Sequence, residues 1–158
     1  MSSFDDQMMR EAIALSAKNL ETGEGGPFGA VIVHNKKIVG RGWNKVTSHC
    51  DPTAHAEVEA IRAAAQNLKN FDLSSCEIYT SCEPCPMCLA AIYWARISKI
   101  YYGNTHQDAA DIQFDDAFIY QEVAKKPQDR TIPMQSCLRE EAQKVFQDWV
   151  AKEDKIPY

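Results

Sequence analysis

The chain has 158 residues, a mass of 17.8 kDa and 45% hydrophobic residues, which suffices for one well-buried core and is too little for two domains. Its formal net charge of -5 and its pI of about 5.3 provide no strong positive field for phosphates, so a small neutral substrate is favoured over a large polyanion. We therefore expect a single domain over residues 1–158, no nucleic-acid partner, and an acidic excess that aids solubility.

We expect no targeting signal in the first segment of the chain. Residues 1–6 contain acidic side chains and no basic region that leads into an apolar stretch. No later apolar run approaches the length that spans a membrane. We therefore expect a cytoplasmic protein without a membrane partner.

The first third of the sequence predicts a helix, a glycine-rich turn and a hairpin. Residues 5–21 carry apolar side chains at helical spacing, and we expect this stripe to pack in the core. Residues 23–29 match neither a dinucleotide fingerprint nor a P-loop, so we interpret them as a tight turn that brings the backbone close to a pocket. Residues 28–34 and 37–43 then predict a β-hairpin. The helical stripe consists of Met9, Ala12, Ile13, Ala17 and Leu20.

Strands and helices alternate in the middle of the chain. Asp51 is predicted to cap a helix that has Pro52 in its first position and ends near Leu68. This alternation indicates an α/β protein with a central sheet and helices on its faces. The later segments are a strand at 76–80, a helix at 84–94, a strand at 97–103, a short helix at 114–120, a final strand at 131–138 despite Pro133, and a helix at 140–152.

Two short motifs supply candidate metal ligands. Cys85 and Cys88 are three residues apart, and on a helix this spacing places both sulfurs on one face, within reach of one tetrahedral ion. His55 completes a set of three Zn²⁺ ligands, which leaves a fourth position for water and so indicates a catalytic zinc. Three of the six cysteines lie within seven residues, so metal binding is favoured over a disulfide framework.

Glu57 is the candidate proton carrier. Residues two apart on a helix point to nearly opposite sides, so His55 and Glu57 converge only from the first turn, beyond the helix end. The sequence thus predicts two helix N-termini that point at one zinc ion. Glu57 would accept a proton from water and return protons to a ring nitrogen and a leaving group. The combined H-x-E and P-C-x-x-C pattern is typical of zinc-dependent nucleobase deaminases.

A closed zinc site is the alternative. Cys82 could act as a fourth ligand beside His55, Cys85 and Cys88, which would make the protein a noncatalytic zinc-stabilised binding module. This alternative leaves Glu57 without a task. It predicts a fourth protein ligand and no release of ammonia.

With these residues in place, the chain resembles the cytidine and deoxycytidylate deaminase superfamily, and more closely the small bacterial guanine deaminases. The resemblance is nearly full length and is carried by residues 25–33, 51–57, 81–88, 92–96 and 114–120. The last of these blocks and the terminal Tyr158 separate guanine deaminases from their relatives.

The resemblance implies a three-layer α/β/α sandwich with a mixed five-stranded sheet and one Zn²⁺ ion per chain. It also implies a homodimer whose C-terminal segments, about residues 139–158, can be exchanged so that each covers the partner's pocket. The implied reaction is hydrolytic deamination of guanine to xanthine and ammonia in purine metabolism. His55, Cys85 and Cys88 correspond to the zinc ligands, and Glu57 corresponds to the proton shuttle.

Further residues acquire substrate-binding roles from the resemblance alone. Asn44 resembles the asparagine that holds the purine ring, where an amide can both donate and accept. Asp116 resembles the carboxylate that binds the N–H donors of the base, and a turn cap is its alternative role. Phe28 and Trp94 resemble the aromatic walls of the pocket, for which core packing is the alternative. Tyr158 resembles part of the lid over the substrate.

Three residues near the motifs have no catalytic role in this interpretation. We expect Cys82 to be a buried thiol, Glu83 a structural acceptor and His106 a loop residue. The closest rival function is that of a tRNA adenosine deaminase, which the acidic charge balance and a closing C-terminal lid disfavour. Guanosine, cytosine and an aminotriazine remain alternative substrates.

Overall fold

The structure is a computed structural model that describes residues 4–158 and divides into two compact units, residues 1–117 and 118–158. The expectation of a cytoplasmic location rests partly on residues 1–3, which lie outside the described residues. Among the described residues, none of the helices combines the length and hydrophobicity that spanning a lipid bilayer requires. The prediction of one domain with a C-terminal covering segment stays a prediction.

The first unit is built on a four-stranded mixed sheet in the order β2-β1-β3-β4. Strand β1 pairs antiparallel with both β2 and β3, and β4 runs parallel to β3. The predicted hairpin and both later strands are confirmed. The strands are β1 (Gly29–His34), β2 (Lys37–Trp43), β3 (Cys76–Cys82) and β4 (Lys99–Asn104).

The expectation of a fifth strand is wrong for the described residues. Residues 131–138, which the sequence analysis assigns to a final strand, contain no regular secondary structure. Pro133 lacks the N–H that a ladder hydrogen bond needs, and the second unit contains no strand with which this segment could pair. Strand β4 is therefore an edge of the sheet.

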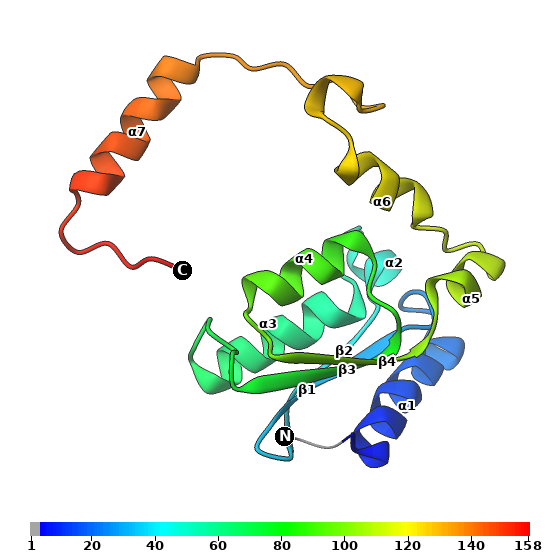
Figure 1. Cartoon of the computed structure of the whole chain (residues 1–158). Helices are drawn as coiled ribbons and strands as arrows, with labels where there is room; N and C mark the ends of the chain where they lie inside the picture. Colours follow the sequence, from blue (N-terminus) through cyan, green and yellow to red (C-terminus); the bar gives the residue numbers. More distant parts are fainter. Residues whose placement is uncertain (1–3) are drawn as a thin grey trace. The chain divides into compact units, whose positions relative to one another are not determined.

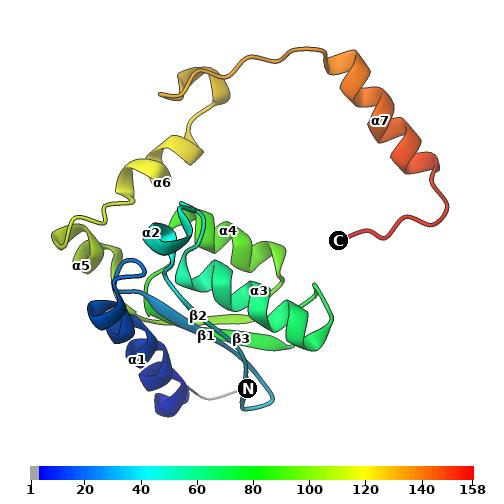
Figure 2. The same cartoon turned by 180° about the vertical axis from the view of Figure 1, so that it is seen from behind.

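Helices cover both faces of the sheet (Figures 1 and 2). Helix α1 (Asp6–Thr22) lies on one face, and α3 (Ala56–Leu68) and α4 (Pro86–Trp94) lie on the other. Successive side chains of a strand point to opposite faces. In β1, Val31 packs with the α1 side chains and Ile32 packs with the α3 and α4 side chains. The expected three-layer α/β/α arrangement is confirmed, with four strands in its central layer.

Helix α1 confirms the first predicted element and corrects its packing. Asp5 caps the helix by accepting a hydrogen bond from the Gln7 N–H at 2.9 Å. Met9 and Ala12 are buried against the sheet, as expected. Ile13, Ala17 and Leu20, assigned to the same apolar stripe, are instead exposed. The buried side of α1 is narrower than predicted, because the sheet covers only the side of the helix that carries Met9 and Ala12.

A direct backbone contact fixes α3 on β2. A Cβ atom added at Gly42 would lie 2.0 Å from the carbonyl oxygen of Ala56. Only a residue without a side chain allows this approach. Since Ala56 is the first residue of α3, the contact ties the beginning of that helix to the end of β2.

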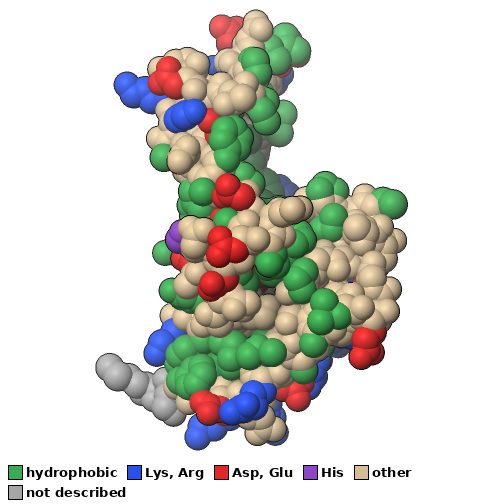
Figure 3. All heavy atoms as spheres, turned by 90° about the vertical axis from the view of Figure 1, so that its right-hand side faces the viewer, with side chains coloured by type: hydrophobic (Ala, Val, Ile, Leu, Met, Phe, Trp, Pro, Cys, Tyr) green, Lys and Arg blue, Asp and Glu red, His purple; other side chains and the backbone are tan. Residues whose placement is uncertain are grey.

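The remaining helices complete both units. The second unit exposes apolar side chains along α7 (Arg139–Ala151), among them Phe146 and Trp149. The space-filling view shows hydrophobic side chains at the surface of the protein (Figure 3).

The predicted helix at 114–120 begins three residues later, and the predicted helix at 140–152 is confirmed. The other helices are α2 (Val46–His49), α5 (His106–Asp111), α6 (Ala117–Ala124) and the short 3₁₀ helix η1 (Pro127–Asp129).

Candidate metal centre and active site

Helix α3 begins at Ala56, and His55 is its N-cap residue. The expected cap at Asp51 is wrong, because its Oδ1 atom accepts from the N–H of Thr53 at 2.8 Å and from its hydroxyl at 2.7 Å. Such a local turn uses the carboxylate before a helix can start. Glu57 follows as the second helical residue, so His55 and Glu57 both lie at the helix N-terminus. The predicted end-on arrangement is therefore observed.

Helix α4 begins one residue after Cys85. Cys85 is the N-cap, and its Sγ accepts from the backbone N–H of Cys88 at 3.5 Å. Pro86, rather than Pro84, occupies the first helical turn. The two sulfurs thus approach each other through cap geometry and not, as predicted, along one helix face.

Three side chains from the two helix N-termini form a potential metal site. The Nδ1 atom of His55 lies 3.5 Å from the Cys85 sulfur and 3.4 Å from the Cys88 sulfur. The donor atoms of all three residues lie within 4.8 Å of one another. A tetrahedral zinc ion with bonds of about 2.3 Å to sulfur and about 2.1 Å to nitrogen separates these atoms by roughly 3.6 Å. The donor set and its spacing therefore fit zinc.

The three donors differ in how readily they lose their protons. The hydrogen bond with Cys88 and the neighbouring His55 lower the pKa of Cys85 to about 4, against the opposing effect of burial. The same hydrogen bond and burial raise the pKa of Cys88. The contact with Cys85 raises the pKa of His55. Binding of a divalent metal to all three residues displaces their remaining protons.

Glu57 is a buried carboxyl group beside the donors. Burial raises its pKa, while its own backbone N–H and the Cys88 side chain partly offset this rise. Its Oε1 atom lies 3.1 Å from the buried hydroxyl of Thr80 on β3. Thr80 gives no functional signal in the sequence, because a threonine within an apolar strand is ordinary. A hydroxyl group of the sheet thus holds the Glu57 carboxyl group in place.

Cys82 lies outside the group of donors found among the described residues. Its Sγ atom lies 3.6 Å from the carbonyl oxygen of Thr105. Burial raises the pKa of this thiol to about 11, with a further contribution from Glu57. Cys82 is therefore a buried thiol, as expected, and the closed four-ligand site has no support in this geometry.

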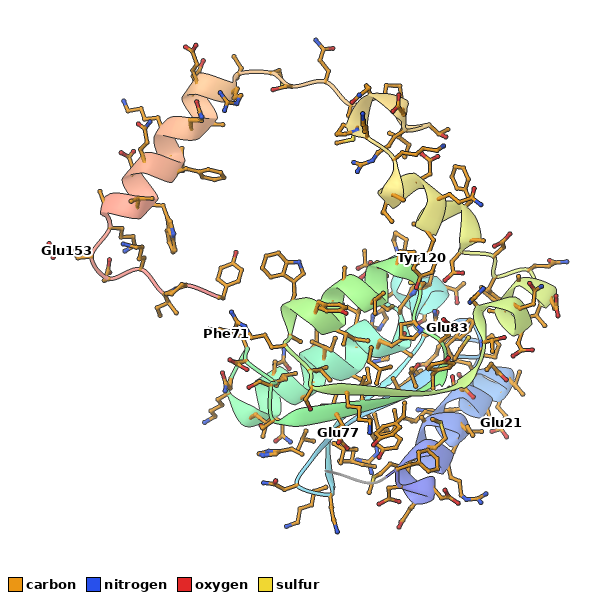
Figure 4. All side chains as sticks on the ribbon, in the orientation of Figure 1. Glu21, Phe71, Glu77, Glu83, Tyr120 and Glu153 are labelled. Atoms are coloured by element: carbon orange, nitrogen blue, oxygen red, sulfur yellow. The ribbon has the colours of Figure 1, made fainter. Side chains whose placement is uncertain are left out.

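Glu83 ties the loop before the metal ligands to α5. Figure 4 shows this residue at the connection between β3 and α4. Its Oε2 atom accepts from the backbone N–H of His106 at 3.0 Å and lies 2.8 Å from its Nδ1 atom. These contacts lower the pKa of Glu83 and raise the pKa of His106. Glu83 is a structural acceptor, as expected. The expectation that His106 is a loop residue is wrong, because the Thr105 cap starts α5 at His106.

Asn44 directly follows β2 and is nearly fully buried. Its Oδ1 atom accepts from the backbone N–H of Gly26 at 3.3 Å and of Val46 at 3.1 Å. A Cβ atom at Gly25 would lie 2.2 Å from this oxygen, so the glycine-rich turn approaches the side chain closely. The oxygen is thus engaged, and only the amino group can bind a ligand.

Asp116 carries an unpartnered polar atom. Its Oδ1 atom is buried without a hydrogen-bond partner among the described residues. Burial raises its pKa, and the negative charge of Cys85 contributes to the rise. A buried acceptor without a donor is suited to an N–H group of a ligand. Phe28 forms an edge-to-face pair with Phe114, with ring centroids 5.0 Å apart.

Two further predicted site residues lie at the end of a helix and at the end of the chain. Trp94 ends α4 and is exposed. Nine residues of helix separate it from Cys85, which is roughly 13 Å along the axis. Tyr158 ends the second unit and is exposed as well. The pocket roles of Trp94 and Tyr158 stay predictions.

Comparison with known proteins gives matches along nearly the whole chain. Residues 2–104 match the family described as the cytidine and deoxycytidylate deaminase zinc-binding region. The guanine deaminase of Bacillus subtilis strain 168 is 49% identical over 144 residues, covering 91% of this chain and 92% of that protein. An X-ray structure of guanine deaminase from Bacillus subtilis matches with a TM-score of 0.94 and 46% identity, covering 99% of each chain.

A second group of relatives matches a shorter part of the chain. The tRNA-specific adenosine deaminase of Haemophilus influenzae is 44% identical over 103 residues. The match covers 65% of this chain and 59% of that protein.

We predict that His55→Ala, Cys85→Ser and Cys88→Ser each lose zinc, because each change removes one of three protein ligands. The zinc content per chain, measured by mass spectrometry of the metal after dialysis, should fall from about one to a small fraction. Cys82→Ser is the matched control and should keep its zinc. Loss of zinc from the control would restore Cys82 as a ligand.

We further predict that His106→Asn destabilises the protein in a pH-dependent way. The raised pKa of His106 contributes stability that is complete below its ordinary pKa of 6.5 and is lost as the pH rises through the raised value. The urea midpoint of the variant should therefore fall more at pH 6 than at pH 9. His34→Asn, whose ring contacts Asn35, is the control. An equal loss at both pH values would contradict the ion pair.

Proposed function

The chain belongs to the cytidine and deoxycytidylate deaminase family, and we propose that it is a zinc-dependent aminohydrolase that converts guanine to xanthine and ammonia. The observation that carries the proposal is the 49% identity to a guanine deaminase over 91% of the chain. The adenosine deaminases of tRNA match only about two thirds of it. We place the reaction in the cytoplasm, on the free purine base.

The donor cluster provides the metal site of the proposed reaction. His55, Cys85 and Cys88 would hold one zinc ion, and no further donor joins them among residues 4–158. Bound zinc acidifies water and so supplies a nucleophile near neutral pH. Because two thiolates donate electron density, they weaken this effect, and an adjacent base is needed. Glu57 stands at the same helix N-terminus as His55 and meets that need.

Glu57 would carry protons through both halves of the reaction. Water adds to C2 of guanine, and the bond between C2 and the amino nitrogen breaks to release ammonia. Glu57 accepts one proton from the water and passes it to a ring nitrogen, and it then accepts the proton of the new hydroxyl group on C2 and passes it to the departing amino group. The raised pKa of this buried carboxyl supports the second task, because an acid donates more readily when its pKa approaches the working pH.

The base would be bound by one hydrogen-bond acceptor and one hydrogen-bond donor. The unpartnered Oδ1 atom of Asp116 accepts from an N–H group of guanine. The amino group of Asn44 donates to an acceptor of the ring. The paired rings of Phe28 and Phe114 offer an apolar wall for a flat base.

We also propose a homodimer in which a second copy completes the pocket. Trp94 on α4 is exposed, and so are the apolar side chains of α7 and the terminal Tyr158. Exposed apolar surface of this extent favours a protein partner. If the C-terminal segments are exchanged, the apolar side chains of α7 pack against the partner chain. The exchange also brings Tyr158 over the partner's site.

We predict that Glu57→Gln keeps zinc and lowers kcat for guanine about 10²- to 10⁴-fold, because proton transfer contributes a factor of this size. Ammonia release should be measured in parallel on guanine, guanosine, adenine, cytosine, ammeline and a tRNA anticodon stem-loop. Glu59→Gln, on the same helix, is the control and should stay active. Preferential release from the RNA would favour the adenosine deaminase function, and release from none would favour a binding module.

We predict that two inactive chains restore activity when they are co-expressed with different tags. Tyr158→Ala impairs the lid and Glu57→Gln impairs the chemistry. In a mixed dimer with exchanged segments, one site has both groups intact, so roughly a quarter of all sites should be active after random pairing. Light scattering should show a dimer. A monomer, or a dimer without recovery of activity, would contradict the exchange.

A further inference from the structure

Asn19 is a buried polar residue of α1 that the proposed reaction does not use directly. Only 5% of it is exposed. Its Nδ2 atom donates to the carbonyl oxygens of Gly26, at 2.7 Å, and of Asn44, at 2.8 Å. Its Oδ1 atom accepts from the hydroxyl of Thr22 at 3.2 Å. One side chain thus joins the glycine-rich turn to the end of β2.

The two segments that Asn19 joins hold the carboxamide of Asn44. The Oδ1 atom of Asn44 accepts from the backbone N–H groups of Gly26 and Val46. Two backbone donors require an oxygen at this position, which settles the orientation of the amide. Among residues 4–158, the Nδ2 atom of Asn44 donates to no acceptor. It is the one group of this side chain that a ligand can use.

The end of β2 lies against the metal site. The backbone N–H of Lys45 donates to the carbonyl oxygen of Ala54 at 2.9 Å, and His55 follows Ala54 in the chain. The N–H of Asn44 donates to the carbonyl oxygen of Phe28 at 3.1 Å. Any shift of Asn44 would therefore change its distance to both the metal ligands and the aromatic wall.

We propose that Asn19 is a positioning residue for substrate recognition: it clamps Gly26 and Asn44 together, so that the Asn44 carboxamide keeps its oxygen toward the protein and its amino group toward the base. The inference rests on the proposed function, because it assumes a base in this site. Asn44 then acts as a donor only and selects a hydrogen-bond acceptor on the ring. Asp116 selects a donor, so the two side chains impose complementary requirements on one base.

The test is a change of ligand preference and not merely a loss of activity. In Asn19→Ala the carboxamide of Asn44 can rotate, so KM for guanine should rise roughly tenfold, as for one lost hydrogen bond, while kcat changes less. Competitive inhibition constants should be measured for 6-thioguanine, 7-deazaguanine and 3-deazaguanine, in each of which one acceptor of guanine is replaced by a much weaker acceptor or by C–H. With wild-type protein, each analogue should bind more weakly than guanine. With Asn19→Ala, this difference in affinity should disappear for the analogue in which the acceptor bound by Asn44 is replaced, and it should remain for the other two analogues.

Asn67→Ala is a matched control. Its Nδ2 atom also joins a helix to the β2 backbone, at the carbonyl oxygen of Val39 and 3.1 Å away, but far from Asn44 along the strand. The control should leave all inhibition ratios unchanged. Thr22→Val removes the donor to Asn19 while keeping the shape of the side chain, and it should shift the same ratio by a smaller factor. It keeps the proposal testable if Asn19→Ala does not fold.

The outcomes separate the inference from the function on which it rests. Wild-type protein that does not deaminate guanine would refute the proposed function. Active wild-type protein together with a folded, zinc-loaded Asn19 or Thr22 variant that weakens all ligands by the same factor would refute the positioning role alone. A structural role predicts that second result, since it changes every ligand equally.

Discussion

The structure of the site depends on two helices that begin at the same place. His55 caps α3 and Cys85 caps α4, and the other two reactive groups follow within the first turn of each helix. The positive ends of both helix dipoles therefore act on one small volume, where they stabilise negative charge. The sheet sets this meeting point, because the end of β2 touches the first residue of α3 at Gly42 and β3 leads into the loop before α4.

The sequence sufficed for the parts of the fold that follow from local patterns. The hairpin, the alternation of strands and helices, and the convergence of His55 and Glu57 on a helix end were all correctly predicted. The errors have physical causes. Asp51 resembled a helix cap, but its carboxylate is satisfied by Thr53 within the preceding turn. Residues 131–138 have strand composition, yet a strand forms only where a partner edge is available. The apolar stripe of α1 included Ile13 and Leu20, whose exposure depends on the width of the sheet beneath the helix.

Long-range hydrogen bonds were the least predictable part of the candidate site. Thr80 and Asn19 look ordinary in the sequence, since their partners lie 23 and 25 residues away along the chain. Asn44 was expected to donate and to accept, but its oxygen is engaged by the backbone. The resulting site combines one engaged amide and one unpartnered carboxylate oxygen. A base that binds there must present an acceptor and a donor at matching positions, which is a stricter requirement than either residue makes alone. The places of Trp94 and Tyr158 in the site stay predictions.

The cap position of Cys85 has a consequence for the newly synthesised chain. Before zinc arrives, its pKa of about 4 makes this sulfur a thiolate at neutral pH. A thiolate is the form that peroxide and alkylating agents attack. Cys82, only three residues earlier, stays protonated because its pKa is about 11. Damage to the unloaded protein should therefore concentrate on the very atom that later binds the metal, and prompt metal loading protects the enzyme from irreversible oxidation.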